Sequence, residues 1–314
     1  MIPFVVVFSV IPLYLVAMIA SRHLRLRLFA AHAFLWLFLA LVLFPLLMTV
    51  SISFRKGNFA DASLFPTPET FSLEHWRMVL GLPDPDLPPD AAPAARPPVL
   101  RWFWNSVKVS ATASALVLLL SATCAYAFAR LPFPGRRRLL SSLLVLQMFP
   151  LVLALIAVYA ILSAIGRVCP ALGLDTHPGL VLAYLGGIAT HVWMIKGYFD
   201  SLPPSLEESA AIDGASPWQT FTRIVLPTAL PAFAVVFLLA FVGLMGEYPT
   251  ASILLQRTEN WTLAVGAASF LYEQNYLWGD FAAAAILSGL PVTLLFLLGQ
   301  KYLVSGLTAG AVKE

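Results

Sequence analysis

Residues 28–50 read LFAAHAFLWLFLALVLFPLLMTV, a run of 23 residues without one aspartate, glutamate, lysine or arginine. A helix needs about 20 such residues to cross the hydrocarbon core of a bilayer. Further segments of similar apolarity follow at 106–129, 139–165, 180–195, 231–253 and 281–304. The sequence therefore predicts an all-α polytopic membrane protein with six core transmembrane helices.

A further apolar segment, residues 3–20, stands at the N-terminus. No basic residue precedes it, and Arg22, Arg25 and Arg27 follow it. A secretory signal peptide carries its positive charges in front of the apolar run, so this order favours a retained anchor with its N-terminus outside. We expect one extra N-terminal hydrophobic helix and a basic linker within residues 1–27.

The composition of the 314 residues excludes several classes of protein. Hydrophobic residues make up 60% and charged residues 11%, whereas a soluble domain has about 25% charged residues. A cytosolic enzyme is therefore excluded. The net charge of +3 is too small for a nucleic-acid surface, so we expect no nucleic-acid partner. The two cysteines, Cys124 and Cys169, offer neither a disulfide framework nor metal-ligand spacing, and we expect no metal site.

Arginine clusters set the predicted orientation, because short cytoplasmic loops carry an excess of basic residues. One cluster precedes the first core span and a second follows the next span: Arg22, Arg25, Arg27, Arg130, Arg136, Arg137 and Arg138. Placing both clusters inside leaves the connections 51–105 and 254–280 outside. The connection 196–230 and the C-terminus then lie inside.

The connection 196–230 departs from this pattern, because acidic residues outnumber basic ones in it. Its charged residues are Lys196, Asp200, Glu207, Glu208, Asp213 and Arg223. A helix that lies on a bilayer surface usually carries lysine and arginine on its polar face. The acidic balance therefore favours docking of another protein, and an interfacial amphipathic hairpin is the alternative.

Capping residues predict a pair of short helices in this connection. Ser205 followed by Glu208 matches a capping box. Gly214 is a typical left-handed helix stop, and Ser216 with Gln219 three residues on matches a second capping box. We expect two short helices that meet at a glycine, with small residues that allow another backbone to approach closely.

The same connection carries a known motif. Glu208, Ser209, Ala210, Gly214, Ile224, Leu226 and Pro227 stand at the spacing of the EAA loop, E-A-A, three residues, G, nine residues, I-x-L-P. The chain thereby resembles the permease subunits of binding-protein-dependent ABC importers. The only departure is Ser209 in place of the middle alanine, which keeps the small size.

Motifs elsewhere in the chain are similar to the MalG type of maltose/maltodextrin permease subunit. They are NSVKV (105–109), CAYAFAR (124–130), FPG (133–135), QMFP (147–150), AYLGG (183–187), QNYLWGD (274–280) and GLTAG (306–310). The similarity covers residues 28–314, and the N-terminal segment 1–27 lies outside it. The resemblance implies a type I importer-like transmembrane permease domain over 28–305 and a cytoplasmic tail over 306–314.

The resemblance also implies the partners and the location. Two different permease subunits, this chain and a larger one, would form the pore in a bacterial inner (cytoplasmic) membrane. A dimeric cytoplasmic ATPase would power them, and a periplasmic sugar-binding protein would deliver maltose or maltodextrin. The chain would be a non-catalytic subunit without a cofactor of its own, since ATP and magnesium bind to the ATPase. It contains no Gly-Lys dipeptide and so cannot carry a Walker A loop.

Three groups of site residues carry over from the resemblance. The coupling loop that sits in the ATPase comprises Glu207, Glu208, Ser209, Ala210, Ala211, Asp213, Gly214, Ile224, Leu226 and Pro227, with Glu208 as both helix cap and charged contact. The tail that reaches between the ATPase subunits, in an extended form, includes Gly306, Thr308, Gly310 and Lys313. The outer loop 254–280 would enter the binding protein, with Thr258, Glu259, Asn260, Trp261 and Thr262 at its tip.

Other functions remain open at this point. The EAA loop does not identify the sugar, so another oligosaccharide is an alternative substrate. A secondary carrier is a weaker alternative, because it would show an internal repeat or a series of intramembrane ionisable residues. Among the polar residues in the spans, we expect Glu247 to reach the outer interface and His191 to be packed and hydrogen-bonded.

Overall fold

The computed structural model describes residues 26–58, 65–83, 97–272 and 275–309. The first core span is α2 (Leu26–Ser53), and α3 (Glu74–Val79) and α4 (Val99–Arg130) follow it. The extra N-terminal helix predicted within residues 1–27 lies outside the described residues, apart from the last two positions of that segment.

The remaining elements follow in chain order. They are α5 (Arg136–Gln147), α6 (Leu151–Val168), α7 (His177–Tyr184), α8 (Ile188–Ser201), α9 (Ser205–Ile212), α10 (Pro217–Thr220), a π-helical turn (Phe221–Val225), α11 (Leu226–Thr228), α12 (Leu230–Met245), α13 (Pro249–Leu254), α14 (Leu263–Ala268), β1 (Leu271–Tyr272), β2 (Asn275–Tyr276) and α15 (Trp278–Ala309). Short 3₁₀ turns occupy Pro170–Leu172, Leu185–Gly187 and Thr258–Asn260.

The described residues contain four candidate membrane spans and two bent helix pairs. Residues 28–53, 99–130, 177–201 and 278–301 are long and apolar enough to cross a membrane. The pair α5–α6 bends by 103°, and the run from α10 into α12 bends by 74°, which makes up to six spans. The six-span prediction agrees with this, but the predicted continuous spans are wrong in detail.

Prolines explain why two of the predicted spans, 139–165 and 231–253, are interrupted. Pro150 precedes α6, and a proline disfavours the helical conformation in the residue before it, so 139–165 is not one straight helix. The predicted span 231–253 likewise breaks after Met245, and α13 begins at Pro249, which has no N–H that would be left unpaired in a first helical turn.

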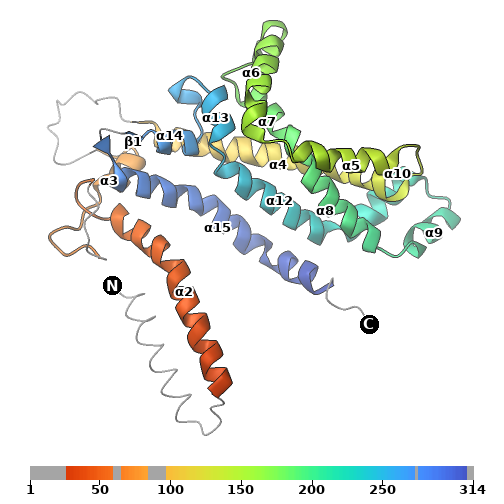
Figure 1. The fold of residues 1–314 in the computed structure, drawn as a ribbon, viewed down its shortest axis with the longest axis horizontal. Coiled ribbons are helices and arrows are strands. Elements are labelled where there is room, and N and C mark those ends of the chain that lie inside the picture. The colour runs from red at the N-terminus through yellow and green to blue at the C-terminus, as the bar shows by residue number, and fades with distance from the viewer. Residues whose placement is uncertain (1–25, 59–64, 84–96, 273–274, 310–314) are drawn as a thin grey trace.

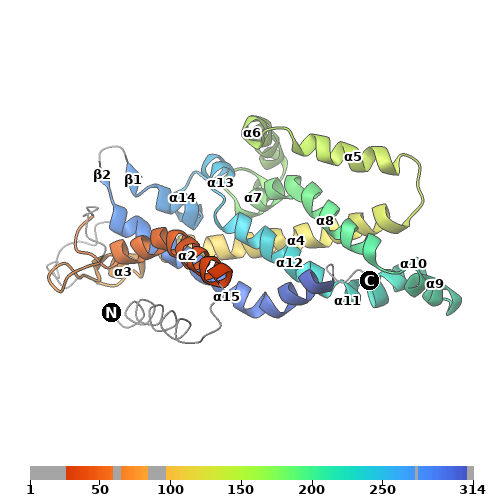
Figure 2. The same cartoon turned by 60° about the horizontal axis from the view of Figure 1, so that its bottom comes forward.

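The long helices α4, α12 and α15 run side by side along the molecule, with α8 packed on α4 (Figures 1 and 2). One face of α4 carries small, buried side chains, the serines at positions 106, 110, 114 and 121. Small side chains allow helix backbones to approach closely inside a membrane. Helix α2 packs against α15 and otherwise presents exposed apolar side chains such as Phe34 and Leu41.

The two ends of the bundle carry different elements. Helices α9 and α10 lie at one end, while α3, β1 and β2 lie at the opposite end (Figures 1 and 2). Strands β1 and β2 pair antiparallel, with Leu271 opposite Tyr276. The predicted orientation places α9 and α10 on the cytoplasmic side and the two strands on the outer side.

Candidate coupling loop and outer loops

The turn between α9 and α10 requires a left-handed residue. Gly214 has φ +81°, and an added Cβ would meet nothing within 4 Å. The backbone conformation, and not a lack of space, therefore favours glycine at this position. The predicted left-handed stop is confirmed.

The two predicted capping boxes have opposite outcomes. The second is present: Ser216 Oγ accepts from Gln219 N at 3.3 Å, and Gln219 Oε1 accepts from Ser216 N at 2.8 Å. The first is wrong, because α9 begins one residue early, with Pro204 at the N-cap and no side-chain cap. Ser205 is thus the first helical residue, and the predicted capping role of Glu208 is wrong as well.

Glu207 connects α9 to the body of the protein. Its carboxylate pairs with the Nε of Arg130, the last residue of α4, and both side chains are 18% exposed. Arg130 Nη2 also donates to the carbonyl oxygens of Phe199 at 2.7 Å and Leu202 at 3.2 Å. The Tyr126 hydroxyl donates to Glu207 at 3.4 Å. One arginine thus joins α4, the end of α8 and α9.

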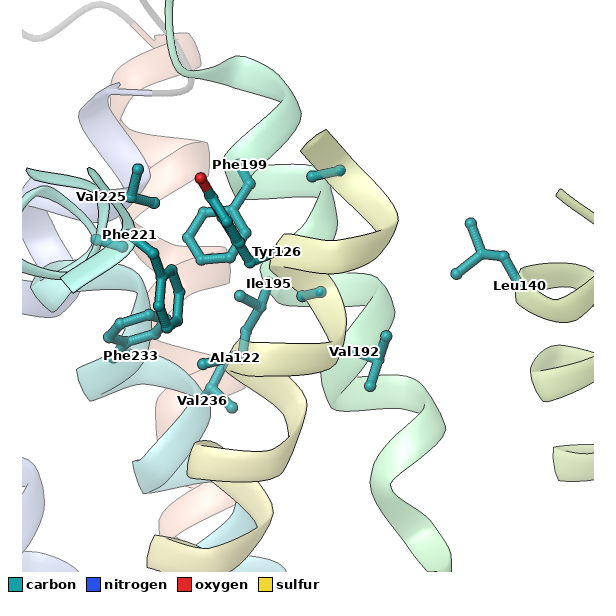
Figure 3. Packing of buried hydrophobic residues seen from close by; sticks show 13 residues of the cluster. Ala122, Tyr126, Leu140, Val192, Ile195, Phe199, Phe221, Val225, Phe233 and Val236 are labelled. Carbon is teal, nitrogen blue, oxygen red and sulfur yellow. The ribbon is translucent and has the colours of Figure 1, made fainter. Parts of the chain in front are cut away.

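An aromatic cluster (Figure 3) adjoins this ion pair through Tyr126. Tyr126 of α4 packs against Phe221 of the π-helical turn, with ring centroids 4.6 Å apart, and against Phe199 of α8 at 6.2 Å. Phe199 in turn meets Phe233 of α12 at 6.1 Å. Phe199 and Phe221 are almost completely buried. Movement of the loop therefore cannot leave α4, α8 and α12 unaffected, since close-packed interiors transmit displacement.

The outer face of the loop is exposed. Ile212 is 87% exposed and Trp218 66% exposed, so the loop carries two large apolar side chains on its surface. The predicted coupling residues on the exposed side are Glu208, Ser209, Ala211, Asp213, Gly214 and Pro227. Ala210 is buried, and Ile224 and Leu226 are half-buried.

Sequence reasoning missed Arg130, Tyr126, Ile212 and Trp218 as parts of this site. The sequence identifies Arg130 as an orientation signal and as part of a family motif, and its position at the end of an apolar run explains a basic residue without any partner. Its contact with Glu207 joins residues 77 positions apart. Neither spacing nor composition reports such a contact.

The outer loop differs from the predicted projecting tip. Trp102 Nε1 donates to the Thr258 carbonyl at 2.7 Å, and Asn105 Nδ2 donates to the carbonyls of Glu259 at 2.9 Å and Trp261 at 3.0 Å. Trp261 packs on Trp102 with ring centroids 5.8 Å apart. This segment lies against α4, and its indole is engaged within the chain.

The rest of the predicted tip is also held in place. Asn260 is half-buried, and Thr262 is 4% exposed, whereas Thr258 and Glu259 are exposed. Asp175 accepts hydrogen bonds from the backbone N–H groups of Gln256 and Arg257, and its carboxylate pairs with the Arg257 side chain. Burial raises the pKa of Asp175, but the hydrogen bonds from Arg257 and Gln256 outweigh it and lower that pKa to about 2.

The part of this loop that reaches the end of the molecule is the pair β1–β2. Leu277 N donates to the Phe270 carbonyl at 2.9 Å and extends the pairing. Tyr276 is 47% exposed and stacks on Trp278 with centroids 5.6 Å apart. Two-residue strands inside a connection give only a weak periodic signal, which is why the sequence did not predict them.

The tail and one acidic residue also differ from expectation. Gly306 and Thr308 belong to α15, which continues to Ala309, so the expected extended backbone from residue 306 is wrong there. Gly310 and Lys313 lie outside the described residues.

Glu247 does not simply reach an interface. Its carboxylate accepts from Thr250 N at 2.7 Å, from Ala251 N at 3.1 Å and from the Tyr184 hydroxyl at 2.7 Å, and so caps α13.

The apolar bundle, with an exposed helix pair anchored at one end, defines a polytopic helical membrane protein. The chain belongs to the family of binding-protein-dependent transport system inner membrane components, whose family model matches residues 117–308. It is therefore a multi-pass membrane transport component and not an enzyme. The matched region includes the whole coupling loop.

Curated relatives are similar over nearly the full chain. The maltose/maltodextrin transport system permease protein MalG of Vibrio vulnificus (strain YJ016) is 54% identical over 297 residues, which is 95% of this chain and 99% of that protein. MalG of Escherichia coli (strain K12) is 52% identical with the same coverage. The predicted resemblance to this type is confirmed.

Solved structures agree with the fold. A bacterial ABC transporter involved in the import of the acidic polysaccharide alginate matches with a TM-score of 0.66 at 22% identity, over 90% of this chain and 98% of that one. The alginate transporter in complex with its pentasaccharide-bound periplasmic protein matches with a TM-score of 0.56 at 16% identity, over 87% and 92% of the chains. Identities this low support the fold alone.

Proposed function

We propose that this chain is one of two permease subunits of an ATP-driven, binding-protein-dependent importer of maltose and maltodextrins in a bacterial inner membrane. The observation that carries the proposal is the 54% identity to a maltose/maltodextrin permease across 95% of the chain. The partners are a larger permease subunit, a dimeric cytoplasmic ATPase and a periplasmic sugar-binding protein.

The geometry of the coupling loop supports a division of work between adjacent glutamates. Glu207 faces inward to Arg130, whereas the Glu208 side chain is exposed and makes no hydrogen bond or ion pair within the described part of the chain. In the proposal, Glu208, Ile212 and Trp218 contact the ATPase. Glu207 and Arg130 pass the displacement of α9 to α4 and α8. ATP-driven closure of the ATPase thereby shifts the bundle between inward-facing and outward-facing states.

The other two predicted contact regions remain parts of the proposal. The C-terminal residues Gly306, Thr308, Gly310 and Lys313 would contact the ATPase. The exposed residues Thr258 and Glu259, together with the β1–β2 pair at the same end, would meet the sugar-binding protein. The exposed ring of Tyr276 supports the inclusion of β2.

Uptake in a bacterial strain that lacks its own MalG-type permease tests the proposal. This chain, expressed with its cognate larger permease, ATPase and binding protein, should restore accumulation of radiolabelled maltose. Omission of the ATPase or of the binding protein should abolish it. Accumulation of an unrelated sugar with no accumulation of maltose would contradict the assignment of substrate, and uptake without the ATPase would contradict the class of transporter.

A further inference from the structure

His75 is a buried histidine that the proposed coupling mechanism does not use. It lies on α3 and is 2% exposed. Its Nδ1 is 2.6 Å from Asp280 Oδ1, and its Nε2 is 3.1 Å from the carbonyl oxygen of Gly57. Both ring nitrogens therefore face acceptors. A neutral imidazole can donate from only one nitrogen, whereas an imidazolium donates from both, so the geometry fits the protonated ring.

The groups around this ring are acidic. Asp280 comes from the first turn of α15, and Glu74 of α3 places a carboxylate oxygen 3.6 Å from Nε2. Burial lowers the pKa of His75, but the hydrogen bond and charge of Asp280, followed by the charge of Glu74, outweigh it and raise that pKa above its ordinary value. The charged ring thus persists to a higher pH than an exposed histidine would allow.

The ring rests directly on the start of α15. A Cβ added at Gly279 would lie 2.0 Å from His75 Nε2, so a side chain there would displace the imidazole. Asn58, just after α2, accepts from the N–H groups of Gly279 at 3.0 Å and Asp280 at 3.3 Å. Three segments that are distant in sequence meet at one turn, which begins two residues after β2.

We propose that protonated His75 is a positioning residue. It joins α3 to Gly57, in the segment that follows α2, and to Asp280 in the first turn of α15, and we call this set of contacts the clasp. The clasp thereby fixes the β1–β2 pair at the outer end of the bundle. The clasp itself does not depend on the proposed function. Only the identity of the partner that β1–β2 meets, the sugar-binding protein, rests on it. Because the histidine pKa is raised in the folded protein, the clasp is complete at low pH. It weakens as the pH rises through that elevated pKa, where the ring loses its donor to Gly57 or to Asp280.

Spin labelling tests the clasp without any use of sugar or ATP. The full complex is reconstituted in lipid with Tyr276→Cys as the only label site of this chain, after Cys124→Ser and Cys169→Ser replacement. Label mobility is followed from about pH 5 to about pH 9, the range in which histidines titrate. Mobility should rise with pH, with a midpoint above the ordinary histidine value. A pH-independent signal would overturn the proposal.

Variants separate the clasp from a general structural role. His75→Gln, which cannot carry a charge, should give high mobility at every pH. Asp280→Asn should move the midpoint to lower pH, because it removes the largest stabilising charge. His177→Gln is the matched control, since His177 contacts the Asn260 carbonyl at 2.9 Å and no carboxylate, and it should keep the wild-type titration. If His75→Gln fails to insert, the wild-type and Asp280→Asn titrations still decide, and an unshifted midpoint in Asp280→Asn counts against the clasp.

Maltose uptake by the same variants distinguishes the two proposals. A pH-dependent mobility together with no maltose uptake in any variant, the wild type included, leaves the clasp standing and removes the proposed function. Normal maltose uptake together with a label mobility that does not change with pH supports the proposed function and contradicts the clasp.

Discussion

The two ends of this protein are anchored in similar ways but present different surfaces. At the α9 end, Arg130 and Glu207 hold the loop from its inner side, and Ile212 and Trp218 remain bare on the outer side. At the opposite end, Trp102 and Asn105 hold the loop against α4, and Asn260, Trp261 and Thr262 of its predicted tip are half-buried or buried. The two loops therefore differ in the side chains that they leave exposed, which are large and apolar at the α9 end and polar at Thr258 and Glu259.

The charge pairs at the two ends also differ in what they respond to. Two of these pairs join a carboxylate to a guanidinium, Glu207 with Arg130 at the α9 end and Asp175 with Arg257 at the outer end. The pKa of Asp175 is lowered to about 2. Of the three contacts compared, the His75–Asp280 contact is the one that includes a histidine, whose ordinary pKa lies near neutrality. We therefore expect the outer end to respond to pH in the histidine range.

Of the changes considered, reversal of charge at Arg130 should weaken the attachment of α9 to α4 and α8 most strongly. Arg130→Glu places two carboxylates together at 18% exposure and leaves the Phe199 and Leu202 carbonyls without their donor. Removal of one partner from a buried pair costs about 3–5 kcal/mol, and a half-buried pair falls toward the lower figure. Maltose uptake should be lost, and the double variant Arg130→Glu/Glu207→Arg should recover part of it. Full uptake by the single variant would show that the pair does not couple the loop to α4.

Substitution of Gly214 should have the next largest effect on the same end. Gly214→Val forces a β-branched residue into φ +81°, and the left-handed region costs an ordinary residue about 1–2 kcal/mol. Gly214→Asn is the matched control, because asparagine tolerates this region. ATP hydrolysis stimulated by the binding protein should fall about tenfold in the valine variant, as a loss of about 1.4 kcal/mol implies, and much less in the asparagine variant. Equal effects would point to contact with the ATPase at this position instead of backbone strain.

At the outer end, loss of Asn105 should loosen the loop without harming the coupling loop. Asn105→Ala removes the donor to the Glu259 and Trp261 carbonyls, and a buried acceptor left unpaired costs about 1–3 kcal/mol. Proteolysis near residue 258 should become faster, while ATP hydrolysis by the assembled complex in the absence of binding protein stays unchanged. Unchanged proteolysis would show that these bonds do not hold the loop.

The Asp175 clamp should show the smallest response, and it serves as the counterpart of His75. Its carboxyl has a lowered pKa, so its contribution is present above the ordinary aspartate pKa and is lost only as the pH falls through about 2. A spin label at Gln256→Cys should therefore show constant mobility between about pH 5 and about pH 9, the histidine range. A change in that range would mean that the loop responds to a group other than Asp175.

Apolar run length predicted the class of fold well, because crossing a bilayer imposes a length and a composition that any chain must meet. The breaks at Pro150 and before Pro249 coincide with prolines that are visible in the sequence, yet the bend angles of 103° and 74° depend on packing against neighbouring helices. Gly214 and the Ser216–Gln219 cap were predictable because both are local. The Ser205 cap failed because Pro204 also suits a helix start, and sequence alone does not choose between adjacent starts.

The long-range contacts were beyond prediction from the chain. The sequence identified Glu207 and Arg130 separately, one in a docking loop and one in an orientation cluster, and nothing local joins them. The sequence placed Trp261 at the tip of the outer loop, and its contact with Trp102, which lies far away in the sequence, could not be predicted. His75 gave no signal at all, since its role depends on Gly57 and Asp280.

The central claim is that the outer face of the α9–α10 loop docks the ATPase while Glu207 holds the inner face to α4. Thiol labelling of Ile212→Cys in inside-out vesicles, with Cys124 and Cys169 replaced by serine, tests it most directly. A membrane-impermeant reagent should label position 212 rapidly when the ATPase subunits are absent and fail to label it when they are assembled, while Tyr276→Cys is labelled in neither state. Labelling of position 212 at the same rate with and without the ATPase would contradict the account.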